Sequence, residues 1–508
     1  MLRNGSWIWI LAAAFCAAGG ETGSEVCAAC HREIYDSYRA TGMAQSSGAA
    51  GRIDGEGWFA DKHSGVRYRV YRRDKAAWFD FDARGIHGRR RLDYFIGSGT
   101  VGRSYLFTVN GFLYEAPVSW YARPAKWDLS PGYQQYDQLY LTRGVETVCL
   151  ECHASRLNPA AGTTNGYGAP PFREGGVSCE RCHGEGEAHV AGRGGMVNPA
   201  KLAPDRRDSI CAQCHLAGEA RIARKEAGAF RPGGRLADSL VVFERQGEPD
   251  MNVTSHFERL AESACKKASG DRLWCGSCHD PHRGPAQTEK VAYYRARCLN
   301  CHQQAQCSRG PDCAGCHMPK SPVRDVGHAA YTDHDIRKPG GSARPAAATL
   351  DCRLVPYGGV EAGAREFGLA YASIAGCEGQ AREYLERAPR DDAKVLADLA
   401  YSYESAGNAA EAAALYRKAL QLDPTQVAAA VNLGNAYVEA GQTPVAIRLW
   451  RSALARSPGL ETVRLSLAVA LYRSGDAAAA EQSLQELLEL DPANRAARKL
   501  LNEDRSGH

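Results

Sequence analysis

The sequence predicts a mainly α-helical protein in two parts. The first part is rich in cysteine and histidine and contains a small antiparallel β subdomain, and the second is a C-terminal α-solenoid. Two observations carry this prediction. Short strings of cysteine and histidine recur between residues 27 and 317. Beyond about residue 359 the composition shifts to alanine, leucine and glutamate, and a helical pattern repeats every 34 residues.

The string Cys-x-x-Cys-His occurs seven times in the first part. It is the attachment signature of c-type haem, in which two thiols bond to the porphyrin edge and the adjacent imidazole lies under the iron. A zinc site with Cys-x-x-Cys usually draws its next ligands from a dozen or more residues away. We therefore expect seven covalently bound haem c groups. The predicted ligands are Cys27, Cys30 and His31; Cys149, Cys152 and His153; Cys179, Cys182 and His183; Cys211, Cys214 and His215; Cys275, Cys278 and His279; Cys298, Cys301 and His302; and Cys313, Cys316 and His317.

The N-terminal residues 1–18 have the composition of a secretory signal peptide. Arg3 precedes an apolar run from Trp7 to Ala18, which is too short to span a bilayer. We expect cleavage near Ala18, with an uncleaved anchor as the alternative, and no transmembrane helix in the mature chain. The expected location is the periplasm or the cell surface, or secretion from the cell, because c-type haem is attached outside the bacterial cytoplasm.

Four cysteines of the mature chain lie outside the motifs: Cys265, Cys307, Cys352 and Cys377. In an oxidising compartment two disulfides are the default expectation. Three connectivities are possible, and proximity in the sequence favours Cys352 with Cys377 and Cys265 with Cys307.

The first part is expected to be a seven-haem cytochrome domain, residues 25–335. A β-rich insertion at about 54–145 is predicted from segments such as VRYRVYRR, and Asn110-Gly111 predicts a two-residue hairpin turn. Six motifs are crowded between Thr147 and Pro319, so the porphyrins themselves are expected to form the core there. Residues 336–358, rich in proline, glycine and alanine, are expected to be a linker.

Three contiguous units of 34 residues follow, starting at Ala393, Val427 and Glu461. Each closes with a proline, and small and aromatic residues recur at matching positions. The pattern resembles the tetratricopeptide repeat, a helix-turn-helix unit. A degenerate unit is expected around Arg365–Arg390, so the domain spans 359–508 and is expected to fold separately. The resemblance implies a concave groove for a peptide or partner protein. The alternative is a packing support for the first part.

The second axial ligand of each iron decides between an electron carrier and a site open to substrate. Histidines outside the motifs are the candidates, and His282 follows His279 by only three residues. Three residues span at most about 10 Å, too little to reach the far side of the same porphyrin. His282 must therefore serve a neighbouring haem, and His87, in an arginine-rich turn, is expected to be a surface residue. The predicted second ligands are His63, His189, His256, His282, His328 and His334.

The segments CHGEGEAH, CGSCHDPH, CAGCHMPK and TDHDI resemble multihaem cytochromes of the c-554 type, related to hydroxylamine-oxidising and doubled-CXXCH cytochromes. More specifically, the chain resembles secreted bacterial multihaem proteins with a C-terminal tetratricopeptide array. The resemblance implies that His189, His256, His282 and His334 are second ligands. At Met43 this sequence departs from its relatives, which often have histidine there.

The predicted function is a multihaem cytochrome that passes electrons along its haems, with redox proteins as partners of the repeat domain. The alternative is an oxidoreductase acting on a small nitrogen or sulfur compound at one open haem, for which the first motif is the candidate. The chain carries 62 Lys and Arg against 58 Asp and Glu. Haem propionates explain the basic excess of the first part, and no motif points to nucleic acid.

Overall fold

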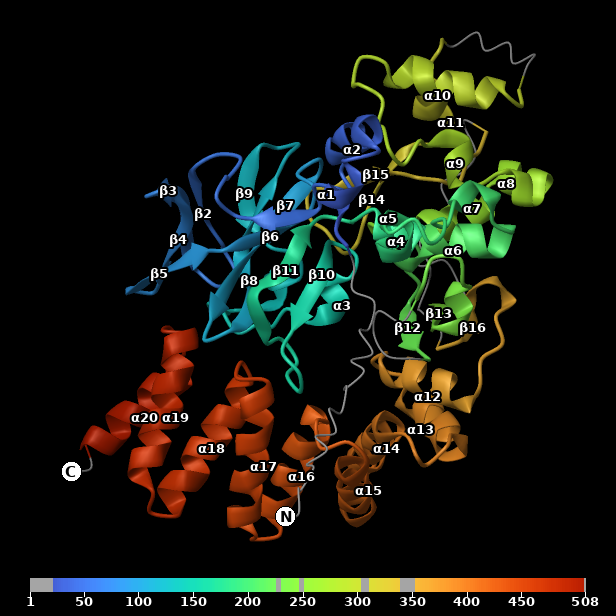
Figure 1. Ribbon diagram of the computed structural model, residues 1–508. Coiled ribbons are helices and arrows are strands. Elements are labelled where there is room, and N and C mark those ends of the chain that lie inside the picture. The colour runs from blue at the N-terminus through green and yellow to red at the C-terminus, as the bar shows by residue number, and fades with distance from the viewer. Residues whose placement is uncertain (1–21, 225–229, 246–250, 303–309, 339–351, 507–508) are drawn as a thin grey trace, which may run out of the picture.

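The computed structural model describes residues 22–224, 230–245, 251–302, 310–338 and 352–506. The predicted signal peptide lies outside these residues. The first part is rich in antiparallel sheets, and the C-terminal part is an array of paired helices that runs as an arc along one side of it (Figure 1). The mainly α character therefore belongs to the C-terminal part.

Two antiparallel sheets form the β subdomain. The first has the order β1-β6-β7-β8-β9, with β1 (Ser47–Ala49), β6 (Tyr94–Ile96), β7 (Gly102–Val109), β8 (Phe112–Tyr121) and β9 (Lys126–Leu129). The second has the order β2-β3-β4-β5, with β2 (Gly57–Ala60), β3 (Arg67–Arg73), β4 (Ala76–Ala83) and β5 (Ile86–Leu92).

Alternating side chains build the core between these sheets. In β4 every second residue is buried, so Phe79 and Phe81 point inward, whereas Asp80 and Asp82 point outward. The Phe79 ring packs on Phe107 of β7 at 6.4 Å between centroids. The predicted hairpin is confirmed: Asn110 and Gly111 join β7 to β8 and both have positive φ, 51° and 82°.

The seven motifs lie on short helices outside the β subdomain, with small antiparallel hairpins between them. The helices that carry motif residues are α1 (Ser24–Cys27), α3 (Thr147–Leu150), α4 (Glu180–His183), α6 (Pro204–His215), α9 (Cys275–Cys278), α10 (Lys290–Leu299) and α11 (Cys313–His317). The other helices are α2 (Arg32–Arg39), α5 (Glu187–Val190), α7 (His256–Glu262) and α8 (Ala264–Ser269). The strands are β10 (Ala154–Pro159), β11 (Tyr167–Gly175), β12 (Ala220–Ala223), β13 (Leu240–Arg245), β14 (Lys320–Pro322), β15 (Ala330–Thr332) and β16 (Leu354–Pro356).

Helix pairs form the C-terminal array, and the three predicted 34-residue units are the pairs α14–α15, α16–α17 and α18–α19. Small residues let the helices of a pair approach closely: a Cβ at Gly434 would lie 2.4 Å from the Trp450 ring. The helices are α12 (Ala364–Ala372), α13 (Glu378–Arg387), α14 (Ala393–Ser405), α15 (Ala409–Leu422), α16 (Val427–Glu439), α17 (Thr443–Arg456), α18 (Glu461–Arg473), α19 (Ala477–Leu490) and α20 (Arg495–Ser506).

The array shares its first hydrophobic core with the first part of the chain. Ile222 of β12, Phe243 of β13 and Leu354 of β16 are buried together with Leu369 of α12 and Leu399 of α14. Strand β16 falls inside the predicted linker, where it pairs with β13, while residues 339–351 of that linker lie outside the described ranges. The two parts are therefore joined by a shared core and by strand pairing, in addition to the linker.

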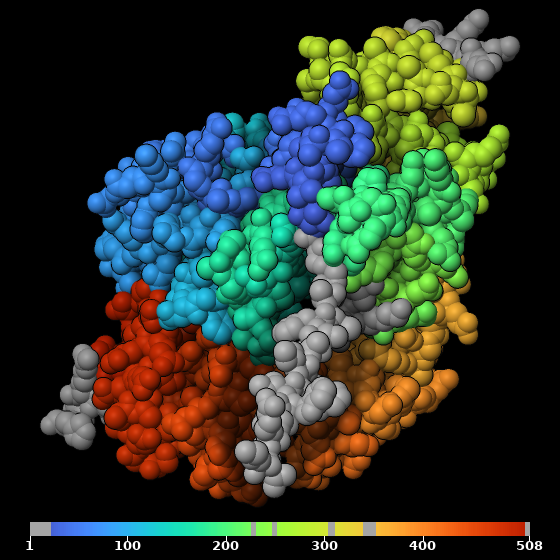
Figure 2. Space-filling view, viewed as in Figure 1, coloured from blue at the N-terminus to red at the C-terminus, as the bar shows by residue number. Residues whose placement is uncertain are grey.

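The other end of the array packs on the β subdomain. Leu490 and Ala493 belong to the same buried cluster as the sheet residues, and the Arg90 guanidinium donates to the carbonyls of Glu489 and Leu490. Figure 2 shows the orange-to-red array lying against the green and the blue parts of the chain on this face. The array is thus held at both of its ends.

One of the two expected disulfides is present, between Cys352 and Cys377. It ties the segment before β16 to the residue before α13, inside the shared core. Cys265 is described as a free thiol, and its expected partner Cys307 lies outside the described residues. In the described ranges, no helix has the length and apolar character that a membrane crossing requires.

Candidate haem sites

Each motif presents its two thiols and its imidazole from one turn of backbone. In an α-helical turn, residues i, i+3 and i+4 lie on one face, which is the spacing of Cys-x-x-Cys-His. In the first, third, fifth and sixth motifs, the histidine N–H donates to the carbonyl of the first cysteine, which closes this turn. These bonds are His31 to Cys27 at 2.9 Å, His183 to Cys179 at 3.0 Å, His279 to Cys275 at 2.9 Å and His302 to Cys298 at 3.0 Å. The turn therefore offers all three groups to one flat ligand.

Imidazoles from elsewhere in the chain face two of the motif histidines in nearly parallel planes. The His31 and His189 rings are 6.3 Å apart at an interplanar angle of 18°, and the His183 and His282 rings are 5.8 Å apart at 14°. An iron held by two imidazoles separates the ring centroids by about 6 Å, since each metal–nitrogen bond is about 2 Å and each nitrogen lies about 1 Å from its ring centre. Both pairs thus have the spacing of two axial ligands.

A row of four imidazoles links two further motifs. His215 lies 4.9 Å from His256, His256 lies 4.9 Å from His334, and His334 lies 6.2 Å from His279. His256 begins α7 and His334 follows β15, so distant segments supply the two central rings. The His279–His334 distance matches a ligand pair, whereas the His215–His256 distance is shorter.

Carbonyl groups orient several of these rings. The Nδ1 atoms lie within hydrogen-bonding distance of backbone oxygens: His183 with Val197 at 2.7 Å, His189 with Gly194 at 3.1 Å, His317 with Arg337 at 2.8 Å and His334 with Thr332 at 3.1 Å. A carbonyl can only accept, so Nδ1 carries the proton and Nε2 keeps its lone pair. This is the tautomer that a metal-ligating histidine needs.

Burial keeps the central imidazoles neutral. It is the main cause that lowers the pKa of His256 to about 3 and of His334 to about 4. Burial also lowers the pKa of His153, His215 and His279. At neutral pH these rings therefore have the uncharged form that binds a metal.

The thiols of different motifs lie close together in pairs. The pairs are near enough for one thiol to shift the pKa of the other: Cys27 with Cys179, Cys152 with Cys214, Cys211 with Cys275, and Cys298 with Cys313. Since each thiol marks one edge of a porphyrin, these pairs would bring the edges of neighbouring haems together. In one of them, the proximity of Cys214 is the main cause that lowers the pKa of Cys152 to about 7.

The surroundings of the motifs fit a bulky apolar cofactor. In the described residues 251–302 and 310–338, which carry three motifs, Ala329 is the only hydrophobic side chain that is buried. A folded segment of this size needs an apolar core. In addition, the Nδ1 atoms of His153, His215 and His256 are buried without a hydrogen-bond partner. Porphyrins attached to these motifs would supply the missing core.

Two of the predicted second ligands lie in other surroundings. His63 is exposed in the turn before β3, where its N–H donates to Asp61. The His328 ring packs on Tyr121 at 4.9 Å, and its Nε2 is 2.8 Å from Asp128. No ring contact of either residue with a motif histidine is found among the described residues. His87, expected at the surface, lies exposed on β5 at 3.7 Å from Asp82.

The first motif, the candidate for an open haem under the alternative reading, has an imidazole near its own. The ring of His189 lies 6.3 Å from that of His31, although the resemblance implies that Met43 stands where a histidine is often found. In the part of the chain that the structure describes, His153, His302 and His317 have no second imidazole in ring contact. These three motifs, and not the first, are therefore the ones with an unassigned axial position.

The sequence did not single out the polar groups that orient these histidines. Backbone carbonyls such as that of Val197 cannot be predicted as hydrogen-bond partners, because every residue type has one. Asp333 and Asp335 flank His334 in the string TDHDI, so a charged partner for them could have been anticipated. That partner, Arg259, is 74 residues earlier, and only the fold brings it to Asp333.

Comparison with known proteins matches both parts of the chain. Residues 129–184 match the family of cytochrome c554 and c-prime, and residues 403–449 and 431–495 match tetratricopeptide repeats. A curated relative is the dissimilatory sulfite reductase MccA of Wolinella succinogenes, 24% identical over 180 residues. That match covers 28% of this chain and 22% of MccA, so the chain spans less than a quarter of this relative's length.

Similar solved structures include MamA, with 20% sequence identity and a TM-score of 0.24, covering 25% of this chain and 77% of MamA. Another is the APC/C hetero-tetramer Cut9–Hcn1, with 23% identity and a TM-score of 0.24, covering 27% of this chain and 28% of that chain.

The repeated motifs and these matches indicate a multihaem c-type cytochrome, with covalently bound haem c. More particularly, the chain combines a segment of the cytochrome c554 type with a tetratricopeptide array, a kind of domain that mediates protein–protein interaction.

Proposed function

We propose that this protein passes electrons along a row of six covalently bound haems, with a seventh joined to the row as a branch, and docks a redox partner through its repeat array. The observation that carries the proposal is the pairwise proximity of thiols from different motifs. Haem c supplies one-electron chemistry when bound. The chain's own residues hold the porphyrin edges together, so an electron has only short distances to cross.

The proximity of the thiols supports one order of the sites. Cys27 lies close to Cys179, which joins the first motif to the third. Cys211 lies close to Cys275, which joins the fourth motif to the fifth. Cys182 of the third motif lies close enough to raise the pKa of Cys211. Cys298 lies close to Cys313, which joins the sixth motif to the seventh. Cys278 of the fifth motif is also close enough to raise the pKa of Cys298. The proposed path is therefore first, third, fourth, fifth, sixth and seventh.

The second motif branches from this row. Its Cys152 lies close to Cys214 of the fourth motif, which lowers the Cys152 pKa, as do the charges of Arg221 and Arg181. The Nδ1 atom of its imidazole, that of His153, is buried. This site is thus joined to the row at the fourth haem and lies in a positively charged environment.

The array has one edge available for a partner. Its opposite edge is occupied: Arg456 donates to the carbonyl of Gly162 at 2.7 Å, and Thr142 donates to Glu461. At Gly407, Gly441 and Gly475, in the turns within the repeats, no described atom lies within 4 Å of where a Cβ would be. We propose that a periplasmic or extracellular redox protein binds on this open side.

The first test is the number of covalently bound haems. The mass of the denatured holoprotein is expected to exceed that of the processed polypeptide by seven haem units, because each Cys-x-x-Cys-His string forms its own thioether bonds. Mass spectrometry measures this directly, and the double substitution Cys211→Ala, Cys214→Ala should remove one unit. A mature protein with five units or fewer would contradict the proposed row.

A second candidate function is favoured by the unassigned axial positions. We infer that an oxidoreductase acting on a small nitrogen or sulfur anion would use the second motif, where His153 has no second described imidazole and Arg181 and Arg221 lie close to Cys152. The similarity to a sulfite reductase agrees with this choice. Electron paramagnetic resonance of the oxidised protein decides: the candidate requires a high-spin signal that changes on addition of sulfite or nitrite. If the spectra contained only low-spin signals, the enzyme candidate would be contradicted and electron transfer would remain as the only proposed function.

A further inference from the structure

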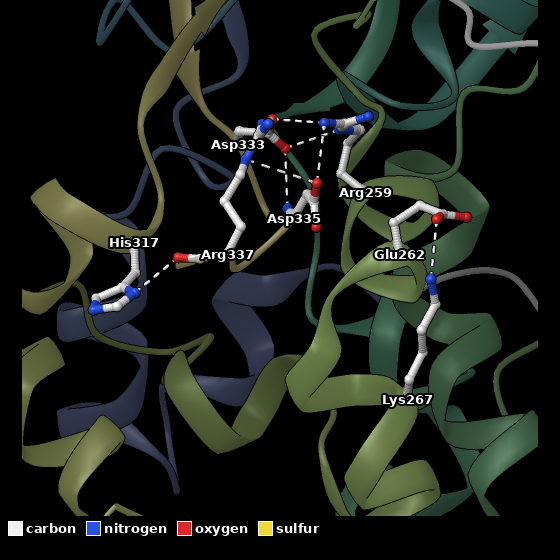
Figure 3. A network of polar contacts seen from close by, with 7 residues as sticks. All are labelled: Arg259, Glu262, Lys267, His317, Asp333, Asp335 and Arg337. Carbon is white, nitrogen blue, oxygen red and sulfur yellow. Dashed lines mark hydrogen bonds and ion pairs between the residues drawn. The ribbon is translucent and has the colours of Figure 1, made fainter. Parts of the chain in front are cut away.

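Four charged residues form a buried network beside the row of imidazoles (Figure 3). Asp333 is 1% exposed and accepts two hydrogen bonds from Arg259, at 2.8 and 2.7 Å, and one from Arg337 at 2.7 Å. Asp335 lies 3.7 Å from Arg259 and 3.8 Å from Arg337. We call Arg259, Asp333, Asp335 and Arg337 the Asp333 clamp.

The clamp lies where three histidine-bearing segments meet. Arg259 is on α7, the helix whose first residue is His256. Asp333 and Asp335 stand on either side of His334 in the sequence. The carbonyl of Arg337 accepts a hydrogen bond from Nδ1 of His317 at 2.8 Å, as Figure 3 shows.

Each of these histidines belongs to a different haem site. His256 lies edge-on to His215 of the fourth motif at 4.9 Å, His334 lies 6.2 Å from His279 of the fifth, and His317 is itself the motif histidine of the seventh. Since one carboxylate, that of Asp333, holds both arginines, the three segments share a single polar anchor. A displacement of any one of them would be passed to the others.

The energetics favour a positional role over a stabilising one. A buried ion pair gains little net stability because desolvation of the charges offsets their attraction. A bidentate Arg–carboxylate pair, however, is specific in its geometry. In the described stretch from residue 251 to 338 there is almost no apolar protein core to fix the segments. The clamp is therefore a buried, geometrically specific contact that ties α7 to the segment of His334.

We propose that the Asp333 clamp is a positioning device that orients His256, His334 and His317 and sets the reduction potentials of the fourth, fifth and seventh haems together. This inference rests on the proposed electron-transfer function. The clamp contains two carboxylates and two guanidinium groups, so its own net charge is zero. Removal of one negative or one positive charge therefore has a predictable effect on the reduction potentials.

Two substitutions of opposite sign test the proposal. Asp333→Asn leaves the clamp with an excess positive charge, which disfavours the ferric iron and raises the potentials of the haems beside it. Arg337→Gln leaves an excess negative charge and lowers the same potentials. A redox titration followed by visible absorption is expected to show at least two haem transitions moving upward in the first variant and downward in the second, with altered low-spin resonances.

The control is Glu262→Gln. Glu262 is also on α7, but its ion pair with Lys267 at 3.1 Å is exposed and lies outside the clamp (Figure 3). This variant is expected to leave every potential where it is in the wild type. If Asp333→Asn does not yield folded holoprotein, Arg337→Gln decides, because the Arg337 side chain is the more exposed arm of the clamp.

The outcomes separate this inference from the proposed function. Wild-type protein without covalent haem would contradict the proposed function itself. Wild-type haem content together with potentials in the clamp variants that match those of Glu262→Gln would contradict the clamp alone. A shift confined to one haem would also overturn it, since the geometry couples three sites.

Discussion

Replacing His282 with alanine is expected to make the haem held by Cys179 and Cys182 high-spin, and to leave the haem held by Cys275 and Cys278 unchanged. His282 follows His279 by three residues, yet its ring lies 5.8 Å from His183, nearly parallel to it. Loss of that imidazole removes one of two strong axial ligands from one iron. Electron paramagnetic resonance of the oxidised protein and the visible spectrum would both report the change.

The matched control for His282→Ala is His87→Ala, which removes an exposed imidazole from β5. Its spectra should be those of the wild type. A change confined to the haem of Cys275 and Cys278 would show that His282 acts locally, against both the reach of the chain and the ring contact with His183.

Replacing Phe243 with alanine is expected to lower the free energy of unfolding by about 3–5 kcal/mol, the usual range for a buried phenylalanine. Phe243 is fully buried and packs on Phe367 of α12 at 5.0 Å between ring centroids. Because this core is built from both parts of the chain, the sheet β12-β13-β16 and the first helix pair of the array should lose stability together. Chemical denaturation of the holoprotein, followed by circular dichroism and haem absorption, measures this.

Tyr401→Ala is the control for Phe243→Ala, since the Tyr401 side chain is 55% exposed on α14. A change at such a surface position is expected to stay within about 0.5 kcal/mol. If Phe243→Ala shifted the helical transition and left the haem transition in place, the array would be an independent domain. The shared core also means that removal of the array would expose Phe243 and Ile222, so truncation is a poor way to test partner binding.

The sequence alone determined the features that depend on neighbouring residues. Cys-x-x-Cys-His specifies covalent haem attachment because a single helical turn brings Cys275, Cys278 and His279 onto one face. Asn110-Gly111 specified a hairpin because both residues tolerate positive φ. The 34-residue period specified helix pairs because small residues such as Gly434 recur where two helices touch. In each case the physics acts over one turn or one repeat.

Only the tertiary structure decided which distant residues act together. His189 faces His31 across a separation of 158 residues, and Arg259 reaches Asp333 across 74, distances that no local pattern encodes. Phe243 and Leu369 likewise belong to one hydrophobic core, although the sequence between them contains the predicted linker rich in proline, glycine and alanine. Such contacts depend on how whole segments pack, and the packing is determined by the sum of many weak hydrophobic and polar interactions. The motifs therefore set which chemistry the chain can carry, and packing set which site each imidazole serves.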